Sequence, residues 1–421
     1  MNLRRNYPLL LVSQFLGAFG DNAILAVILG QLLNFSTKGL ITDLDFRSRS
    51  VFYTSLLFVP YVLLAPLAGY FNDRFPKTSA LQLGNLLKLI GTAVCALSIP
   101  FGFEWQTLGY LIVGVGSCLY GPAKYGILPE ILPVERLVKA NGTVELLTLV
   151  AIISGGVGGA SLVDRFTLKI CYVALLALYG LALGLNTIMA PTPSDTGVRL
   201  GKTLGEFFGH LRDLVTAPRL GKVLIGTALF WICGSGLKNN FQAWGLQILH
   251  LPNNLQVSLL GLWLSIGIMV GSVLAGVWHR VGDLHRTRLY GFALVVTLAL
   301  LWSVEPIIAW REWVMVVQGM TLYPGVIALL MATGFAAGLF LIPLNAALQA
   351  ESDPEKLGKT IAVQNFCENI GMLLAGGMVA ACVKLGVSAG GVFAALAALV
   401  LGVVLWLRFP EPGARANSLS K

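Results

Sequence analysis

Long apolar stretches recur along the chain, and each is long enough to cross a lipid bilayer. About a dozen have a length of roughly 20 residues, which is what a membrane-spanning helix needs. Apolar residues make up 56% of the 421 positions and charged residues only 12%, too little polar surface for a water-soluble protein of this size. The expected spans lie near 8–34, 50–71, 78–99, 107–127, 138–162, 168–190, 220–249, 256–278, 287–304, 323–346, 360–383 and 388–407. The sequence therefore predicts an all-α, multi-pass integral membrane protein.

The distribution of basic residues predicts how the chain is oriented. An even number of spans places both termini on one side of the membrane. Most of the loop lysines and arginines lie on the side of the opening segment MNLRR, and loops rich in these residues stay in the cytoplasm. We therefore expect both termini to be cytoplasmic, and we interpret the formal charge of +9 as a signal of orientation, with no role in binding nucleic acid.

The N-terminal apolar run resembles a signal peptide only superficially. It is too long, it carries Asp21, it has no small-residue cleavage site, and eleven further spans follow it. We interpret it as the first membrane span.

The cysteines and histidines indicate neither disulfides nor a metal site. All six cysteines fall in expected spans without C-x-x-C spacing, and we expect them to act as small packing residues. The four histidines fall in loops or at span ends. No metal and no cofactor is expected.

The longest polar connection, 191–219, separates six spans from six. We expect an N-terminal bundle over 1–190, a cytoplasmic linker over 191–219, and a C-terminal bundle with a short tail over 220–421. The region 305–318, between the ninth and tenth spans, is the least regular, and an interfacial segment is one interpretation of it.

A faint internal repeat relates the two halves. Pro122 precedes Glu130 at the same spacing at which Pro343 precedes Glu351. The polar pair Asn141 and Glu145 in the fifth span has a counterpart in Gln364 and Glu368 in the eleventh. Such repeats are common in transporters, where the substrate site lies between the repeats.

The segment GYFNDRFPK, Gly69–Lys77, ends the second span. It resembles the loop signature of the major facilitator superfamily, in which a glycine, an acid and two bases recur at this spacing. The corresponding turn after the eighth span, GVWHRVG, keeps Gly276 but has Arg280 in place of the acid. The resemblance implies a twelve-helix fold of two six-helix bundles that alternate around a central site. Without it, the segment would be only a charged turn that orients the chain.

Charged residues within the expected spans are the strongest functional candidates, because a charge at membrane depth is costly unless it faces a bundle interior or a wet cavity. Helical spacing adds polar neighbours on the same faces. The six charged residues are Asp21, Lys88, Lys124, Glu145, Lys238 and Glu368.

Each of these charges also has a purely structural interpretation. Lys88 and Glu145 could form an ion pair between neighbouring helices. Lys124 lies near a span end, where its ammonium could reach the interface, although Pro122 and Gly126 weaken the helix around it. Asp21 lies too deep for that and must meet a cation or bind a proton.

Several of these segments together resemble one family. FGDN, NLLKLIG, PAKYGILPE, LVKANGTVE and IPLNA…IAVQNFCEN look like the bacterial lysophospholipid transporters of the major facilitator superfamily. The resemblance implies transport of lysophosphatidylethanolamine and lysophosphatidylglycerol from the outer to the inner leaflet of the cytoplasmic membrane, where an acyltransferase restores the second chain. It also implies that Asp21 is the family's first-helix carboxylate, that Lys124 is its fourth-helix lysine, and that Lys238 stands where arginine is frequent.

The expected site residues follow from the charges, their polar neighbours and the resemblance. The substrate-binding candidates are Asp21, Asn22, Lys88, Lys124, Glu145, Lys238, Asn345, Gln364, Asn365 and Glu368. The gating and signature candidates are Gly69, Asp73, Arg74, Lys77 and Glu130.

Two other classes of function compete with this interpretation. A proton-coupled drug or metabolite exporter of the same superfamily usually has proline within its fifth-span glycine cluster, whereas GGVGG, Gly155–Gly159, has none. An integral-membrane acyltransferase would need a motif such as H-x-x-x-x-D, which the sequence lacks. We therefore expect a non-enzymatic monomer whose partners are the lysophospholipid, the bilayer and a separate acyltransferase/acyl-carrier-protein synthetase.

Overall fold

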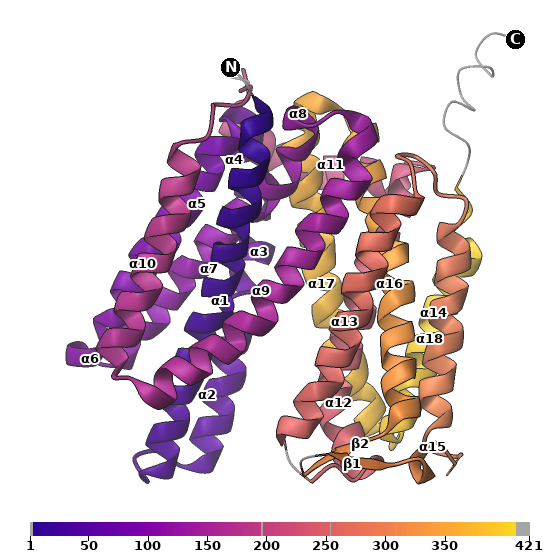
Figure 1. The fold of residues 1–421 in the computed structure, drawn as a ribbon. Coiled ribbons are helices and arrows are strands. Elements are labelled where there is room, and N and C mark those ends of the chain that lie inside the picture. The colour runs from indigo at the N-terminus through magenta and orange to yellow at the C-terminus, as the bar shows by residue number, and fades with distance from the viewer. Residues whose placement is uncertain (1–2, 195–196, 253, 308, 318, 410–421) are drawn as a thin grey trace, which may run out of the picture. The chain divides into compact units, whose positions relative to one another are not determined.

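The computed structural model describes residues 3–194, 197–252, 254–307, 309–317 and 319–409, and most of them lie in helices (Figure 1). The helical elements up to residue 216 are η1 (Leu3–Arg5), α1 (Asn6–Thr37), α2 (Asp43–Leu56), α3 (Val59–Leu63), α4 (Ala65–Arg74), α5 (Lys77–Ala96), α6 (Ser98–Phe101), α7 (Phe103–Gly126), α8 (Leu128–Ile131), η2 (Val134–Arg136), α9 (Leu137–Arg165), α10 (Leu168–Thr187) and α11 (Leu200–Thr216). The elements that follow are α12 (Leu220–Gln247), α13 (Asn254–Trp278), α14 (Thr287–Ser303), α15 (Ala309–Glu312), β1 (Met315–Val317), β2 (Met320–Leu322), α16 (Pro324–Glu351), η3 (Pro354–Lys356), α17 (Leu357–Lys384) and α18 (Ala389–Trp406).

The expected spans coincide with these helices, and the all-α membrane fold is confirmed. Within the described parts of the chain, nine helices are long and apolar enough to cross a membrane, and a tenth span is broken between Leu63 and Ala65 with a bend of 57°. α14 is apolar but shorter.

Prolines explain the broken second span. Pro60 occupies the first turn of α3, and Pro66 occupies the first turn of α4. Proline is tolerated in the first turn of a helix but disrupts the hydrogen bonds of a continuing one. The span therefore restarts at each proline.

Close helix packing within the membrane depends on glycine. A β-carbon on Gly84 of α5 would lie 2.8 Å from the carbonyl oxygen of Gly116 of α7, and one on Gly91 would lie 2.6 Å from that of Gly109. Both distances are shorter than van der Waals contact, so only glycine allows α5 and α7 to approach this closely.

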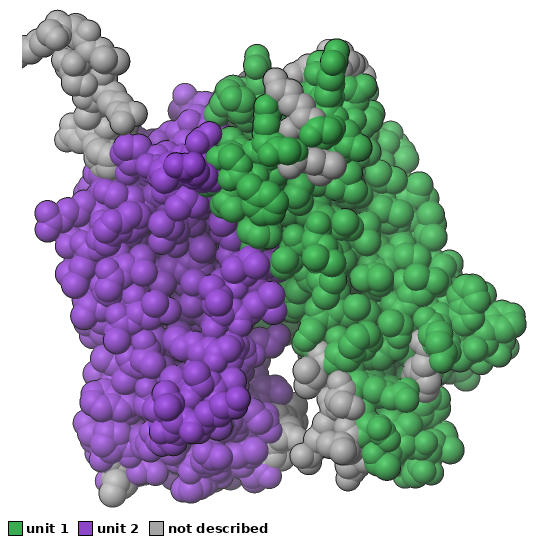
Figure 2. Space-filling view, turned by 180° about the vertical axis from the view of Figure 1, so that it is seen from behind, with its two compact units in different colours: residues 1–133, 147–211, 353–366 green, residues 134–146, 212–352, 367–421 purple. Residues whose placement is uncertain are grey.

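Contacts divide the chain into two units (Figure 2). One unit holds residues 1–133, 147–211 and 353–366, and the other holds 134–146, 212–352 and 367–421. Most of each unit follows the expected halves. However, the first residues of α9 pack with the second unit, and the first residues of α17 pack with the first.

The expected linker over 191–219 contains a helix, α11, that packs on the start of α17 within the first unit. The rings of Phe207 and Phe366 lie 5.8 Å apart, edge to face. His210 Nε2 lies 3.1 Å from Thr360 Oγ1. This part of the connection is therefore a folded element.

The irregular region between α14 and α16 forms the short helix α15 and a two-stranded antiparallel ribbon. β1 and β2 pair with Met315 opposite Leu322 and Val317 opposite Met320. Gln318, between the strands, lies outside the described residues.

Candidate functional site

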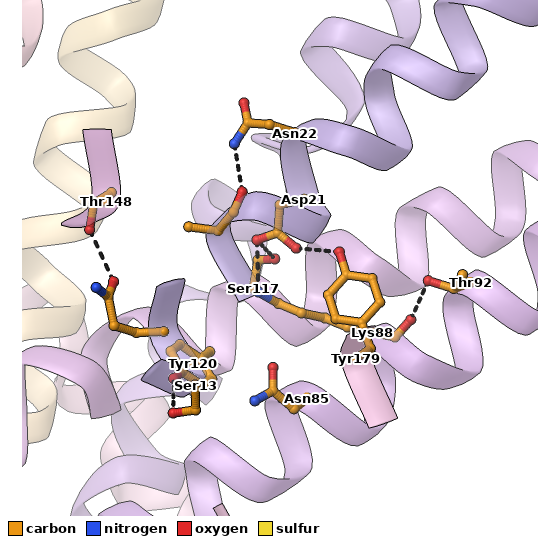
Figure 3. Close-up of polar contacts among 12 residues, drawn as sticks. Ser13, Asp21, Asn22, Asn85, Lys88, Thr92, Ser117, Tyr120, Thr148 and Tyr179 are labelled. Carbon is orange, nitrogen blue, oxygen red and sulfur yellow. Dashed lines mark hydrogen bonds and ion pairs between the residues drawn. The ribbon is translucent and has the colours of Figure 1, made fainter. Parts of the chain in front are cut away.

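Asp21 of α1 is the centre of a buried polar cluster in the first unit (Figure 3). Its Oδ2 accepts hydrogen bonds from Lys88 Nζ at 2.7 Å and from Ser117 Oγ at 3.0 Å. Its Oδ1 accepts a hydrogen bond from the hydroxyl of Tyr179 at 2.8 Å. The side chains of Asp21 and Lys88 are only 14% and 3% exposed. Four helices, α1, α5, α7 and α10, each supply one member of the cluster.

The ion pair identifies the cation that Asp21 requires. The sequence left open a pairing of Lys88 with Glu145; the structure instead pairs Lys88 with Asp21. Removing one partner of such a buried pair leaves an uncompensated charge, which costs about 3–5 kcal/mol. The two charges therefore depend on each other, and any ligand that separates them must replace both contacts.

A second set of hydrogen bonds lies one to two turns away from Asp21, on the same four helices. Asn186 of α10 donates to Ser13 Oγ at 2.9 Å and accepts from Asn85 Nδ2 at 2.6 Å. Ser13 Oγ lies 3.2 Å from the hydroxyl of Tyr120. The ammonium of Lys88 lies 5.1 Å from the centroid of the Tyr120 ring, a favourable cation–π distance. Both sets of contacts therefore meet at Lys88.

The sequence analysis missed the uncharged members of this cluster. Ser117, Tyr120 and Tyr179 are common residues in apolar helices, and nothing in their spacing distinguishes them from packing residues. Asn186 was detectable as a polar residue near the end of the sixth span, seven residues after Tyr179 and thus on the same helical face.

Asn22 does not join the cluster. Its amide donates to the carbonyl of Ala18, one turn back in α1, at 2.9 Å, and Figure 3 shows it directed away from the carboxylate of Asp21. Adjacent helical residues point about 100° apart, so only one of the two can face the cluster.

Lys124 lies in the last turn of α7, after the internal Pro122. Its ammonium lies 4.5 Å from the ring centroid of Tyr125, and its side chain is half-buried. One turn earlier, a β-carbon on Gly121 would lie 3.1 Å from the amide nitrogen of Asn365. Asn365 of α17 is thus placed against this end of α7, within the first unit.

The other substrate-binding candidates differ in burial. Within the second unit Lys238 of α12 is exposed, whereas the remaining candidates there are buried: Glu145, Asn345 and Glu368. Gln364, in the first unit, is also buried. Their joint role in binding stays a prediction.

The signature segment Gly69–Lys77 packs on the start of α17. Both carboxylate oxygens of Asp73 lie 3.1 Å from the backbone nitrogen of Lys359, which donates to them. A carboxylate is favoured there because the free N–H groups of a helix N-terminus carry partial positive charge. A β-carbon on Gly69 would lie 3.2 Å from the Cα of Lys359. The glycine therefore permits the approach, and the acid stabilises it.

The two bases of the segment bind elsewhere. Lys77 Nζ lies 3.2 Å from Glu130 Oε1 and donates to the carbonyl of Asn72 at 2.6 Å. Arg74 donates to the carbonyl of Val198 at 2.6 Å. Burial raises the pKa of Glu130, and the ammonium of Lys77 opposes this rise. Lys77 thus links the start of α5 to α8, and Arg74 links the end of α4 to the segment before α11.

The segment GVWHRVG, interpreted as a second copy of the signature, has a different set of contacts, and Arg219 donates to the carbonyl of its Gly282 at 2.9 Å. Glu351 binds Arg219 through both oxygens, at 2.7 and 2.8 Å. A β-carbon on Gly276 would lie 2.9 Å from the Cα of Lys139, in the first turn of α9. Arg280 is exposed.

Metal chemistry finds no support among the residues that the structure describes, because no group of three or more His, Cys, Asp and Glu side chains is placed to hold an ion. The arrangement offers paired charges and hydroxyls within apolar helices, which suits a ligand with a polar head and an apolar body.

Comparison with known proteins gives consistent matches. Residues 10–332 match the family model of the Major Facilitator Superfamily. The chain is 35% identical to the lysophospholipid transporter LplT of Photorhabdus laumondii subsp. laumondii over 97% of each chain. It is 34% identical to that of Pectobacterium carotovorum over 92% of this chain and 88% of the relative.

Solved transporters share the fold at low sequence identity. The human organic anion transporter MFSD10 superposes with a TM-score of 0.74 at 16% identity, over 97% of this chain and 100% of the other. A bacterial homologue of the iron transporter ferroportin gives 0.73 at 15% identity, over 95% and 98%. These similarities concern the fold alone.

Proposed function

Because the chain belongs to the major facilitator superfamily and, within it, to the family of bacterial lysophospholipid transporters, we propose that it moves lysophospholipids across the membrane by alternating access. The substrates we propose are lysophosphatidylethanolamine and lysophosphatidylglycerol, taken from the outer leaflet of the bacterial cytoplasmic membrane and delivered to the inner one. The relatives are named as transporters, which supports a transport protein over an enzyme.

The observation that supports the proposal most directly is the ion pair of Asp21 and Lys88 at membrane depth. A lysophospholipid head carries a phosphate and, in the ethanolamine form, an ammonium. The phosphate can take the place of Asp21 beside Lys88, while the ammonium takes the place of Lys88 beside Asp21. Charge is then balanced before and after binding, which limits the desolvation cost of moving the head into the protein.

The hydroxyls of Ser117 and Tyr179 extend this idea. Both donate to Asp21, so the carboxylate keeps two hydrogen bonds when Lys88 turns to a phosphate. A buried carboxylate with fewer donors would be costly to separate from its cation. The two hydroxyls therefore act as positioning groups for Asp21.

We assign the remaining charged candidates to substrate binding: Lys124, Lys238, Glu145 and Glu368. The contact of Asp73 with the start of α17 serves as a gate that has to open for release. Both termini are cytoplasmic in this proposal, the protein acts as a monomer, and a separate acyltransferase/acyl-carrier-protein synthetase consumes the product.

Reconstitution in liposomes with labelled lysophospholipid on one leaflet tests the function. We expect flipping by the wild type and a loss of about tenfold or more in Asp21→Asn and Lys88→Gln, because each leaves one buried charge unpaired. Lys169→Gln removes an exposed lysine at the start of α10 and serves as the matched control with wild-type rates.

Two outcomes would contradict the proposal. Transport of drugs or metabolites without any lysophospholipid flipping would favour the exporter of the same superfamily. Equal losses on a phosphate-bearing lysolipid and on a neutral monoacylglycerol would remove the paired charges from head-group recognition.

A further inference from the structure

A run of exposed apolar residues lies between α14 and α16, at the end of the second unit where α16 begins (Figure 1). All five residues from Trp313 to Val317 are exposed, with Trp313 at 61% and Val316 at 70%. β1 forms most of this run, and among the described residues it pairs with β2 alone. We call the described residues 313–317 and 319–322 the apolar ribbon.

The apolar ribbon is fixed to the helices beneath it. The side-chain amide of Gln256, at the start of α13, donates to the carbonyl of Gly319 at 3.3 Å and accepts from the backbone of Thr321 at 3.0 Å. Tyr323 donates to the carbonyl of Leu249 at 2.7 Å. These contacts hold β2 on the bundle, and the three residues of β1 remain exposed.

Water is a poor environment for such an element. Exposed strands of soluble proteins usually carry charges, lysine above all, that prevent pairing with other chains. The apolar ribbon has no such protection, because no charged residue occurs between Glu312 and Glu351. An uncharged, apolar edge strand in water would be prone to aggregate.

The surroundings of the apolar ribbon indicate a lipid surface as its partner. α14, which leads into it, exposes Leu289, Val296 and Leu300 at helical spacing, as a helix does toward lipid. The exposed residues continue through Trp302 and Ile307 to Trp313. Tryptophans gather where a membrane protein meets the head groups. Exposed apolar residues therefore recur along the chain from the span to the ribbon, and the exposed Glu312 directly precedes Trp313.

Backbone hydrogen bonding limits how deep the apolar ribbon can lie. The outer edge of β1 is unpaired within the described residues, and unpaired N–H and C=O groups are not tolerated in the hydrocarbon core. The backbone therefore lies at the hydrated head-group level, and the side chains reach down toward the acyl chains.

We propose that the apolar ribbon is a lipid anchor that inserts Trp313, Val314 and Val316 into the membrane interface at the start of α16. In the orientation of the proposed function this is the extracytoplasmic leaflet, the one from which the substrate is taken. The anchor holds the ends of α14 and α16 at the level of the lipid head groups. It does not depend on which lipid is transported, so its test is separate from the test of transport.

Spin labels on the full-length protein in nanodiscs of phosphatidylethanolamine and phosphatidylglycerol test the anchor. The label is attached to Val316→Cys after the half-buried Cys367 and Cys382 are replaced by alanine; the other four cysteines are buried. The reference positions are Val296→Cys in α14 and Lys356→Cys in η3, an exposed lysine in a polar turn. The same protein without an added cysteine has to remain unlabelled.

Oxygen concentrates in the bilayer, whereas a nickel chelate stays in water. We expect the label at Val316 to be relaxed more strongly by oxygen than by the chelate, as at Val296, and the label at Lys356 to show the opposite order. A label at Val316 that behaves like the one at Lys356 would overturn the proposal. Shielding from both reagents would overturn it as well, and would indicate a second copy or another protein as the partner.

A second measurement avoids cysteine altogether. Lipids brominated near the head group quench tryptophan fluorescence at short range. We expect the quenched fraction of the emission to fall in Trp313→Phe, since an exposed, lipid-bound fluorophore has been removed. An unchanged or larger quenched fraction would place Trp313 away from the lipid and contradict the anchor.

Discussion

The ends of α4 and α13 carry the two segments that we interpret from the sequence as copies of one signature, and the segments keep different parts of it. In each, a glycine faces the start of a long helix: Gly69 faces Lys359 of α17, and Gly276 faces Lys139 of α9. Only the first copy adds a carboxylate, Asp73, that binds the helix N-terminus. The corresponding residue of the second copy, Arg280, is exposed.

The residue before the acid is also comparable between the copies. Asn72 donates to the carbonyl of Ala68, one turn back, at 2.9 Å. His279 Nδ1 lies 3.3 Å from the carbonyl of Ala275, again one turn back. A carbonyl can only accept, so this nitrogen carries the proton, and Nε2 accepts from the hydroxyl of Tyr290 at 2.9 Å. Asparagine and histidine thus fill one structural role, but only histidine titrates.

These differences separate a steric requirement from an electrostatic one. Both copies place a glycine in a close helix contact: a β-carbon would be too close to the backbone at Gly276, at 2.9 Å, and tight at Gly69, at 3.2 Å. Of these two contacts, only the one at the start of α17 has a carboxylate, that of Asp73, bound to the partial positive charge of a helix N-terminus. We therefore expect the contact of α4 with α17 to respond to charge, and the contact of α13 with α9 to respond to shape alone.

The largest effect is expected from filling the glycine contacts. Gly276→Val and Gly69→Val push a side chain against backbone atoms that cannot move aside, which costs about 3 kcal/mol, at the upper end for overpacking. The closer contact at Gly276, 2.9 Å against 3.2 Å, should make it the more sensitive. The thermal unfolding midpoint and the rate of lysophospholipid flipping are measured for both variants. Wild-type values in either variant would show that the helix contact does not require glycine at that site.

Next in size is the effect of breaking the ion pair between Glu351 and Arg219 in the second unit. Glu351→Gln leaves Arg219 with its bond to the carbonyl of Gly282 but removes a two-pronged ion pair whose side chains are only partly exposed. A loss of about 2 kcal/mol is expected, as for hydrogen bonds to charged groups. The unfolding midpoint is the measurement, and Glu355→Gln, in an exposed turn, is the control that should leave it unchanged.

A smaller effect is expected from the charge of Asp73. Asp73→Asn keeps a hydrogen-bond acceptor for Lys359 but loses the favourable interaction with the helix N-terminus, worth about 1 kcal/mol. Arg280→Asn, its matched variant in the second copy, should change stability by less than about 0.5 kcal/mol. We expect a lower unfolding midpoint and a slower flipping rate in Asp73→Asn than in Arg280→Asn. Equal values in the two variants would show that the acid is dispensable.

The smallest effect concerns pH. Burial lowers the pKa of His279 below its ordinary value, so the folded protein favours the neutral ring. Stability from this group is therefore present above the unfolded pKa, about 6.5, and is lost as the pH falls from there toward the folded value. His279→Asn, which copies Asn72, should reduce the difference in unfolding midpoint between pH 7.5 and pH 5.5. An undiminished difference would assign the acid sensitivity to other groups.

Some of the site was predictable because it depends on residue type and chain position. The signature residues were identified from their spacing, and the structure places Gly69 and Asp73 on the start of α17. Asp21 and Lys88 were identified because charges in apolar helices are rare. Their pairing was not predictable, because the sequence contains several acids that could pair with Lys88. Which of them does so depends on how α1 and α5 pack together.

The sequence by itself determined the membrane-spanning architecture, because the length and apolarity of each helix depend only on local composition, and a bilayer selects for both. It did not determine where the helices are interrupted: the second span breaks at Pro60 and Pro66, whereas α7 and α16 continue through Pro122 and Pro343. The tertiary structure alone decided which donors surround Asp21, which residues of α9 and α17 pack with which unit, and that the segment after α14 pairs as an exposed apolar ribbon. Those features arise from contacts between residues far apart in the chain, and such contacts leave no periodic pattern in the sequence.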